Sequence, residues 1–166
     1  MPHPMLTMAV RAARAAGTVI SRATDHVADL TIESKQRNDF VSEVDRQAEH
    51  AIIDILKRAY PDHQFLGEES GDSGQTESAY RWIIDPLDGT TNFLHGLPHY
   101  SVSIALEYQA RIELGVIYNP SNQELYTAER GGGAFLNNRR IRVAGLRNLE
   151  GALLGTGFPF RPEQDL

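Results

Sequence analysis

The sequence predicts an α+β protein, because helical patterns occupy its first sixty residues and strand patterns fill most of the remainder. Apolar residues recur at three-and-four spacing in residues 4–27 and 44–59, whereas after residue 100 they alternate with polar ones. Two helices followed by a run of adjacent strands favour a layered domain with a mainly antiparallel sheet.

Composition limits the function classes. The chain has 166 residues, enough for one domain with a real core, and no cysteine, which excludes disulfides, thiol chemistry and Cys-ligated zinc. A formal charge of −6 argues against direct nucleic-acid binding and favours a small-molecule substrate. No apolar run approaches the ~20 residues of a membrane span, and no secretory leader pattern is present, so we expect a cytoplasmic protein without a membrane partner.

The first predicted helix runs from Pro4 to about Val27 and has a narrow stripe of small residues. Such a stripe permits close packing against a neighbour. An interfacial membrane helix would need bulky Trp, Phe or Leu on that face, and these are missing.

A short extended segment, residues 29–35, and a polar loop, residues 36–39, precede the second helix. Ser42 and Asp45 resemble a capping pair at its start, and Pro61 ends the run. By spacing alone Asp45 is structural. The outer face is expected to be solvated and includes Arg46, Glu49, Lys57 and Arg58.

The later strands are predicted from alternation and from turn residues. We expect a short strand at 65–66, a polar loop at 71–78, a hairpin of strands 101–108 and 112–118, and further strands at 125–128, 134–136 and 152–155. The triple glycine at 131–133 is a strand connector, because no Lys-Ser or Lys-Thr and no helix follow it. His95 and His99 are expected in a loop, since Gly96 and Pro98 disfavour a helix there.

Residues 82–93 (WIIDPLDGTTNF) are the most informative stretch. An apolar run typical of a buried strand leads into Asp85 and Asp88, and Pro86 fixes a turn between them. Both carboxylates and the Leu87 carbonyl can then converge, and hard oxygen ligands favour Mg²⁺ or Mn²⁺. An ordinary surface turn is the alternative, because Asp, Pro and Gly are all turn formers.

A phosphate site is predicted immediately after these carboxylates. Gly89 lets the backbone approach a ligand closely, and residues 90–92 (TTN) form a plausible helix start. Free N–H groups at a helix start face outward and favour an anion such as phosphate.

At these residues the chain resembles the inositol monophosphatase family, which belongs to the Mg²⁺-dependent, Li⁺-sensitive sugar and nucleotide phosphatases. Residues 85–93, then Gly96 and Pro98, are similar to the family's central signature, and residues 67–70 (GEES) to its upstream glutamate motif. The resemblance extends from the first helix to the last residue and is strongest to the bacterial, SuhB-like branch.

The resemblance implies a five-layered α-β-α-β-α fold of which residues 1–166 hold the N-terminal, metal- and phosphate-binding α+β half. The C-terminal domain of family members, with a Trp-Asp motif that completes the metal site, is absent from this sequence. The chain is therefore expected to be about 60% of a family-length protein, and its activity by itself is in doubt.

The resemblance also implies roles for individual residues. Glu68, Asp85, Asp88 and the Leu87 carbonyl would hold two Mg²⁺ ions, while Thr90, with Glu68 and Asp45, would orient the attacking water. The backbone N–H groups of Gly89, Thr90 and Thr91 would bind the phosphoryl oxygens. Lys35 would lie near the phosphate, although a solvated loop lysine explains it equally well.

The implied function is Mg²⁺-dependent hydrolysis of inositol 1-phosphate by a homodimer. Fructose-1,6-bisphosphatase, histidinol-phosphatase and 3′-phosphonucleotidase activities are alternatives within the enzyme class. Two alternatives lie outside it. One is a transcription antitermination partner that acts through RNA polymerase or its accessory factors, and the other is a catalytically inactive scaffold.

Overall fold

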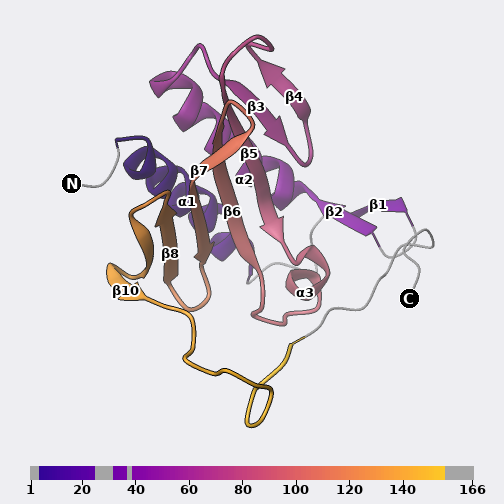
Figure 1. Ribbon diagram of the computed structural model, residues 1–166. Coiled ribbons are helices and arrows are strands. Elements are labelled where there is room, and N and C mark those ends of the chain that lie inside the picture. Colours follow the sequence, from indigo (N-terminus) through magenta and orange to yellow (C-terminus); the bar gives the residue numbers. More distant parts are fainter. Residues whose placement is uncertain (1–3, 25–31, 37–38, 156–166) are drawn as a thin grey trace.

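The computed structural model describes residues 4–24, 32–36 and 39–155 (Figure 1). Two long helices and one short helix accompany ten strands in this part of the chain. In order they are α1 Pro4–Ala23, β1 Ile32–Gln36, β2 Asp39–Ser42, α2 Glu43–Ala59, β3 Gln64–Gly67, β4 Gly71–Gly74, β5 Tyr80–Asp88, α3 Thr90–Leu94, β6 Ser101–Tyr108, β7 Arg111–Asn119, β8 Glu124–Glu129, β9 Gly133–Leu136 and β10 Arg139–Ile141.

Eight of the strands form one sheet in the order β10-β9-β8-β7-β6-β5-β3-β4, and β1 and β2 form a separate hairpin. Neighbours in the large sheet are antiparallel except β3 and β5, which run parallel. The predicted α+β class with a mainly antiparallel sheet is confirmed. Because parallel strands end at the same edge of a sheet, the residues that follow β3 and β5 lie close together.

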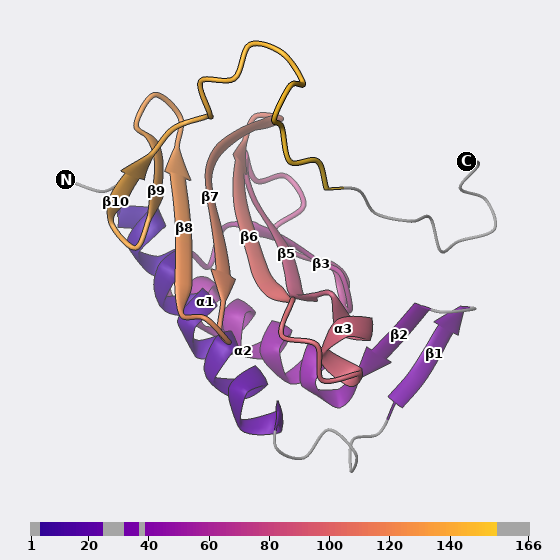
Figure 2. The same ribbon diagram turned by 90° about the horizontal axis from the view of Figure 1, so that it is seen from below.

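The two long helices cover one face of the sheet, as Figure 2 shows. Buried alanines on α1, among them Ala9, Ala12 and Ala16, confirm that its small-residue stripe packs inward. The core also includes Trp82 on β5 and Ile52 on α2, both fully buried. The helices thus back the strands that lead to the site.

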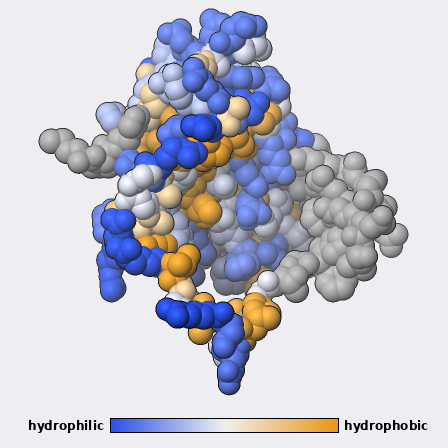
Figure 3. Space-filling model, viewed as in Figure 1, coloured by the Kyte–Doolittle hydropathy of each residue, from blue (hydrophilic) through white to orange (hydrophobic). Residues whose placement is uncertain are grey.

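The opposite face of the sheet has no helix over it within the described residues. Figure 3 shows apolar side chains gathered in the middle of this face, and Ile117 is 47% exposed there. A shallow hollow of about 300 Å³ lies on it, lined by β6, β7, β8 and β9 residues such as Ala105, Gly115 and Ala134.

Several predicted boundaries hold. The helix that was predicted to reach Val27 is helical to Ala23, and residue 27 lies outside the described part of the chain. The second helix begins directly after Ser42 and ends before Pro61. The hairpin of β6 and β7 and the turn at 131–132 between β8 and β9 are confirmed, as is the loop position of His99.

Other predictions were wrong. The polar segment 36–39 is not a loop throughout, because Gln36 ends β1 and Asp39 begins β2. Residues 71–74 form β4, which pairs with β3 despite their glycine and serine content, and β10 was missed. The strand predicted at 152–155 is absent from the described structure, where Leu153 is 98% exposed and has no partner strand to cover it.

One glycine of α1 allows the close approach of helix and sheet. A Cβ added at Gly17 would overlap the ring of Tyr118 on β7 and lie 3.3 Å from Cβ of Pro120.

We predict that Gly17→Val lowers the free energy of unfolding by about 2 kcal/mol, because overpacking displaces the Tyr118 ring. Thr18→Val, at the exposed neighbouring position, should stay within about 0.5 kcal/mol of wild type. Urea denaturation measures both, and equal effects would contradict the packing described.

Candidate active site

The two aspartates of β5 reach the same side of the sheet through a bulge. Asp85 pairs with Ser103 and Asp88 with Ser101, so three steps along β5 match two steps along β6. Side chains three residues apart normally point to opposite faces, and the extra residue restores a common face. Pro86 fits this bulge because it has no N–H to offer the ladder. The predicted turn at Pro86 is thus an interruption within β5, which continues to Asp88.

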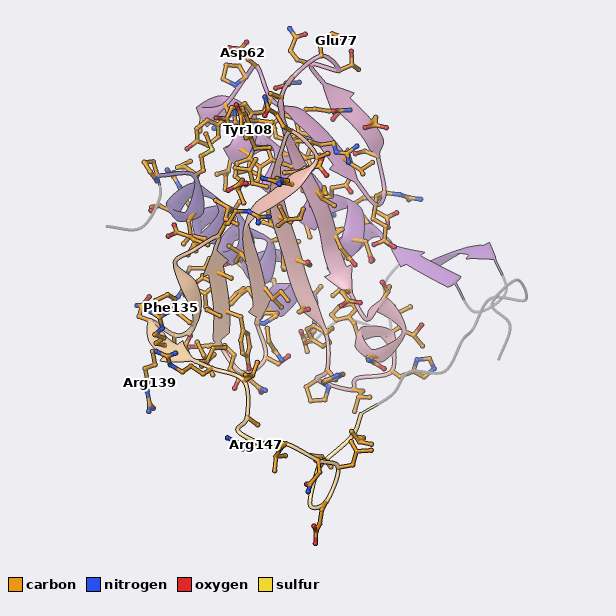
Figure 4. The ribbon with its side chains drawn as sticks, in the orientation of Figure 1. Asp62, Glu77, Tyr108, Phe135, Arg139 and Arg147 are labelled. Atoms are coloured by element: carbon orange, nitrogen blue, oxygen red, sulfur yellow. The ribbon has the colours of Figure 1, made fainter. Side chains whose placement is uncertain are left out.

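Glu68 comes to the same edge from the neighbouring strand. Gly67, the last residue of β3, pairs with Ile84, and the Glu68 N–H donates to the Ile84 carbonyl at 3.0 Å. Because β3 and β5 are parallel, Glu68 and Asp85 both follow the ends of their buried runs. Figure 4 helps to locate this edge: Asp62, Glu77 and Tyr108 mark the opposite end of the sheet.

Glu68 and Asp88 are close enough to change the ionisation of Asp85. The pKa of Asp85 is raised from 3.8 to about 7, first by burial and then by the charge of Glu68 and a hydrogen bond with it. The charge of Asp88 raises the pKa further, whereas the hydrogen bond from the Leu87 N–H to Asp85 Oδ1, at 3.2 Å, lowers it. A cation between these groups would relieve their repulsion, so the donor set fits a divalent metal. Within the described residues, however, no group of three or more His, Cys, Asp or Glu side chains is arranged so that it could hold a metal ion.

A second pair of residues meets beside the carboxylates. The Thr90 hydroxyl, at the start of α3, lies 2.9 Å from Asp45 Oδ1 and 3.0 Å from the Leu87 carbonyl oxygen. Asp45 lies on α2 and is 1% exposed. The structure therefore brings together two residues that are 45 positions apart in the sequence. The hydroxyl has a single proton, so it donates to one of these oxygens and keeps its lone pairs for another donor.

Gly89 makes the turn from β5 into α3 possible. Its φ is 94°, a left-handed conformation that favours glycine, and an added Cβ would lie 2.9 Å from the His99 carbonyl oxygen. The predicted helix start is confirmed, although α3 has only five residues. A polar hollow of about 370 Å³ adjoins this turn, lined by Asp88 and Gly89 together with Asn92, His99, Asn119, Asn122 and Glu124 among others.

Lys35 and Asp39 belong to β1 and β2, and their side chains lie outside the described part of the structure. The prediction of a phosphate role for Lys35 is therefore untested.

One residue of the region was misassigned from the sequence. Glu49 was placed on the solvated face of α2, which is wrong, since it is 3% exposed and accepts hydrogen bonds from the N–H groups of Glu69 and Ser70. A usable signal existed: Glu49 follows Asp45 by four residues, and positions four apart share one face of a helix.

Comparisons with known proteins identify the family. The family model described as the inositol monophosphatase family matches residues 1–166. The chain belongs to this family.

Relatives of this inositol monophosphatase family member include the Nus factor SuhB of Pseudomonas aeruginosa, 54% identical over 164 residues, which cover 98% of the chain and 60% of the relative. Among solved structures, the extragenic suppressor protein SuhB of Bartonella henselae superposes with a TM-score of 0.87 at 50% identity, covering 89% of this chain and 57% of that one. An inositol monophosphatase from Anabaena superposes with a TM-score of 0.74 at 36% identity, covering 87% and 51%.

The chain thus spans about three-fifths of the length of the curated relatives it matches. Members of the family are generally metal-dependent, in keeping with the carboxylates at the end of β5. No helix in the described residues is both long and apolar enough to cross a membrane.

The raised pKa of Asp85 predicts an effect of pH on stability. The folded state holds a proton that the unfolded state loses above pH 3.8, so this stabilisation is complete at low pH and is lost as pH rises through about 7. Glu68→Gln removes the charge and lowers the pKa of Asp85. We expect this variant, without metal, to be about 1 kcal/mol more stable than wild type at pH 8, and the gain to shrink towards pH 4.

Urea denaturation in the presence of a chelator measures this difference. Glu77→Gln, an exposed change in the segment before β5, is the matched control and should be neutral at both pH values. A Glu68→Gln variant less stable than wild type at pH 8 would contradict the repulsion described.

Proposed function

We propose that the protein is a metal-dependent phosphate monoester hydrolase whose substrate is an inositol monophosphate. The observation that supports this best is that Glu68 and Asp88 both lie near Asp85 at one end of the sheet, next to the Thr90 and Asp45 pair. Membership of the inositol monophosphatase family supports the choice of reaction and substrate.

Glu68, Asp85, Asp88 and the Leu87 carbonyl would hold Mg²⁺, with Mn²⁺ as a possible replacement, because hard oxygen donors suit both ions. Such ions, when bound, supply positive charge that activates water and stabilises the leaving alkoxide. The chain's own contribution is to hold Glu68 and Asp88 near Asp85, whose pKa is raised first by burial and then by the charges of these neighbours.

The attacking water would be oriented by Thr90. Asp45 accepts a hydrogen bond from the Thr90 hydroxyl, which leaves that oxygen as an acceptor for a proton of the water. Glu68 would be the second partner of this water. Asp45 is buried, so its geometry is fixed by α2 rather than by solvent.

The phosphoryl oxygens would bind to the N–H groups of Gly89, Thr90 and Thr91. The left-handed Gly89 leads into the first turn of α3, where the N–H groups of a helix have no carbonyl of a preceding turn to accept them. Donors aimed at the transferring group stabilise charge that develops during displacement.

Related sugar and nucleotide phosphatase activities, on fructose 1,6-bisphosphate, histidinol phosphate or 3′-phosphonucleotides, are the alternatives within the same chemistry. The homodimer implied by the resemblance is also a proposal, which analytical ultracentrifugation tests.

The central test is phosphate release from inositol 1-phosphate, with and without Mg²⁺ and with added Li⁺. It uses this chain and a chimera that continues it with the C-terminal part of the Pseudomonas aeruginosa relative. We expect the chimera to release phosphate in a Mg²⁺-dependent, Li⁺-inhibited reaction. In the chimera, Asp88→Asn should reduce kcat about a hundredfold or more, because several kcal/mol of charge stabilisation are lost.

Asp54→Asn is the matched control, since Asp54 is a half-exposed partner of surface ion pairs on α2. It should leave kcat unchanged. Equal activity of Asp88→Asn and wild type would contradict the proposal.

Thr90→Ala tests whether Thr90 orients the attacking water or binds the metal. We expect kcat to fall about tenfold to a hundredfold with little change in the Mg²⁺ concentration for half-maximal activity, because Thr90 orients water and is not a ligand. A large change in Mg²⁺ dependence would assign Thr90 to the metal instead.

A second candidate function follows from the names of the relatives. Bacterial proteins 46–54% identical to this chain are named Nus factor SuhB, which favours a role with RNA polymerase or antitermination factors. If that role is independent of catalysis, Asp88→Asn should still bind purified RNA polymerase in a pull-down as strongly as wild type. If neither wild type nor Asp88→Asn binds RNA polymerase, the result would count against this candidate.

A further inference from the structure

A buried carboxylate lies behind the turn that bears Glu68. Glu49 Oε2 accepts a hydrogen bond from the Glu69 N–H, and Glu49 Oε1 accepts one from the Ser70 N–H, each at 2.9 Å. Glu49 is 3% exposed. A buried charge is costly unless it is hydrogen-bonded, and here each oxygen has its own backbone donor.

Gly67 gives this carboxylate its access to the turn. A Cβ at Gly67 would overlap Glu49 Oε2 and lie 2.6 Å from Glu49 Cδ and 2.8 Å from Ser70 Oγ. No φ is exceptional at this glycine, so the requirement is for space and not for backbone conformation. Any side chain here would push the carboxylate away from the two N–H groups.

Three consecutive N–H groups around Glu68 therefore have fixed partners. That of Glu68 bonds to Ile84 on β5, and the next two bond to Glu49 on α2. The backbone of Glu68 is held from the sheet on one side and from the helix on the other.

The same helix holds the other half of the site. Asp45, one turn before Glu49, accepts the hydrogen bond of Thr90. One face of α2 thus fixes the residue that orients water and the turn that presents a carboxylate to the metal.

We propose that Glu49 is a positioning residue for Glu68, which sets the affinity of the site for divalent cations without touching the ion. The proposal rests on the proposed function, in which Glu68 is a metal ligand. Partners that orient a ligand are typically worth 10-fold to 100-fold in metal affinity or activity.

Glu49→Gln tests this directly. A glutamine keeps the shape but replaces one acceptor oxygen by a donor amide, so one N–H of the turn loses its partner. With Mn²⁺ alone as the probe, and free ion measured by electron paramagnetic resonance, we expect the dissociation constant to rise about tenfold. Glu43→Gln, the same change at an exposed position of α2, should alter it less than twofold.

Glu68→Gln is measured beside these variants so that two failures can be told apart. If wild type binds no Mn²⁺, or Glu68→Gln binds it as wild type does, the proposed function fails and this inference fails with it. If Glu68→Gln weakens binding but Glu49→Gln does not, only the inference is overturned. A lower unfolding temperature of Glu49→Gln with unchanged Mn²⁺ affinity has the same meaning, because it describes a purely structural residue.

Two further measurements decide the matter if Glu49→Gln does not fold. Gly67→Ala pushes the Glu49 carboxylate away from the turn, because the added Cβ would overlap it. This variant should weaken Mn²⁺ binding by a similar factor. In wild-type protein, the amides of Glu69 and Ser70 should be protected from hydrogen exchange without metal. Rapid exchange of both amides would overturn the proposal.

Discussion

A one-residue bulge in β5 turns Asp85 and Asp88 to the same side of the sheet, and the candidate site depends on it. With regular pairing the two carboxylates would lie on opposite faces, and neither could share an ion with the other. The parallel pairing of β3 with β5 then adds Glu68 at the same edge. The pKa of Asp85 is raised there, first because burial disfavours its charge and then because Glu68 and Asp88 lie near it.

Buried polar groups on α2 stabilise this arrangement from behind. Asp45 holds Thr90, and Glu49 holds the turn that follows Glu68, so the helix acts as a rigid support for residues that belong to loops and strand ends. The close approach of α1 to β7 at Gly17 contributes to the packing of the helical layer on the sheet. Groups held in this way need little reorganisation when a charged ligand arrives.

Much of this could be predicted from the sequence, and the reasons for the failures are physical. The buried strand, the glycine turn and the cluster of Asp85 and Asp88 follow from short-range patterns and from the resemblance. The burial of Glu49 is harder to predict, because its partners are backbone N–H groups of a turn 20 residues away and only the four-residue spacing from Asp45 points to it. Likewise β4 has no apolar pattern and exists because β3 offers it hydrogen bonds, whereas 152–155 has apolar residues but no neighbouring strand in the described part of the chain.

Glu68, Asp85 and Asp88 are proposed to bind a divalent cation together. The most direct measurement is a crystal structure of the protein grown with Mn²⁺, in which anomalous scattering locates the ion independently of the protein model. We predict an anomalous peak within bonding distance of oxygens from these three side chains. Well-ordered carboxylates with no peak between them, or a peak bound by other residues, would contradict it.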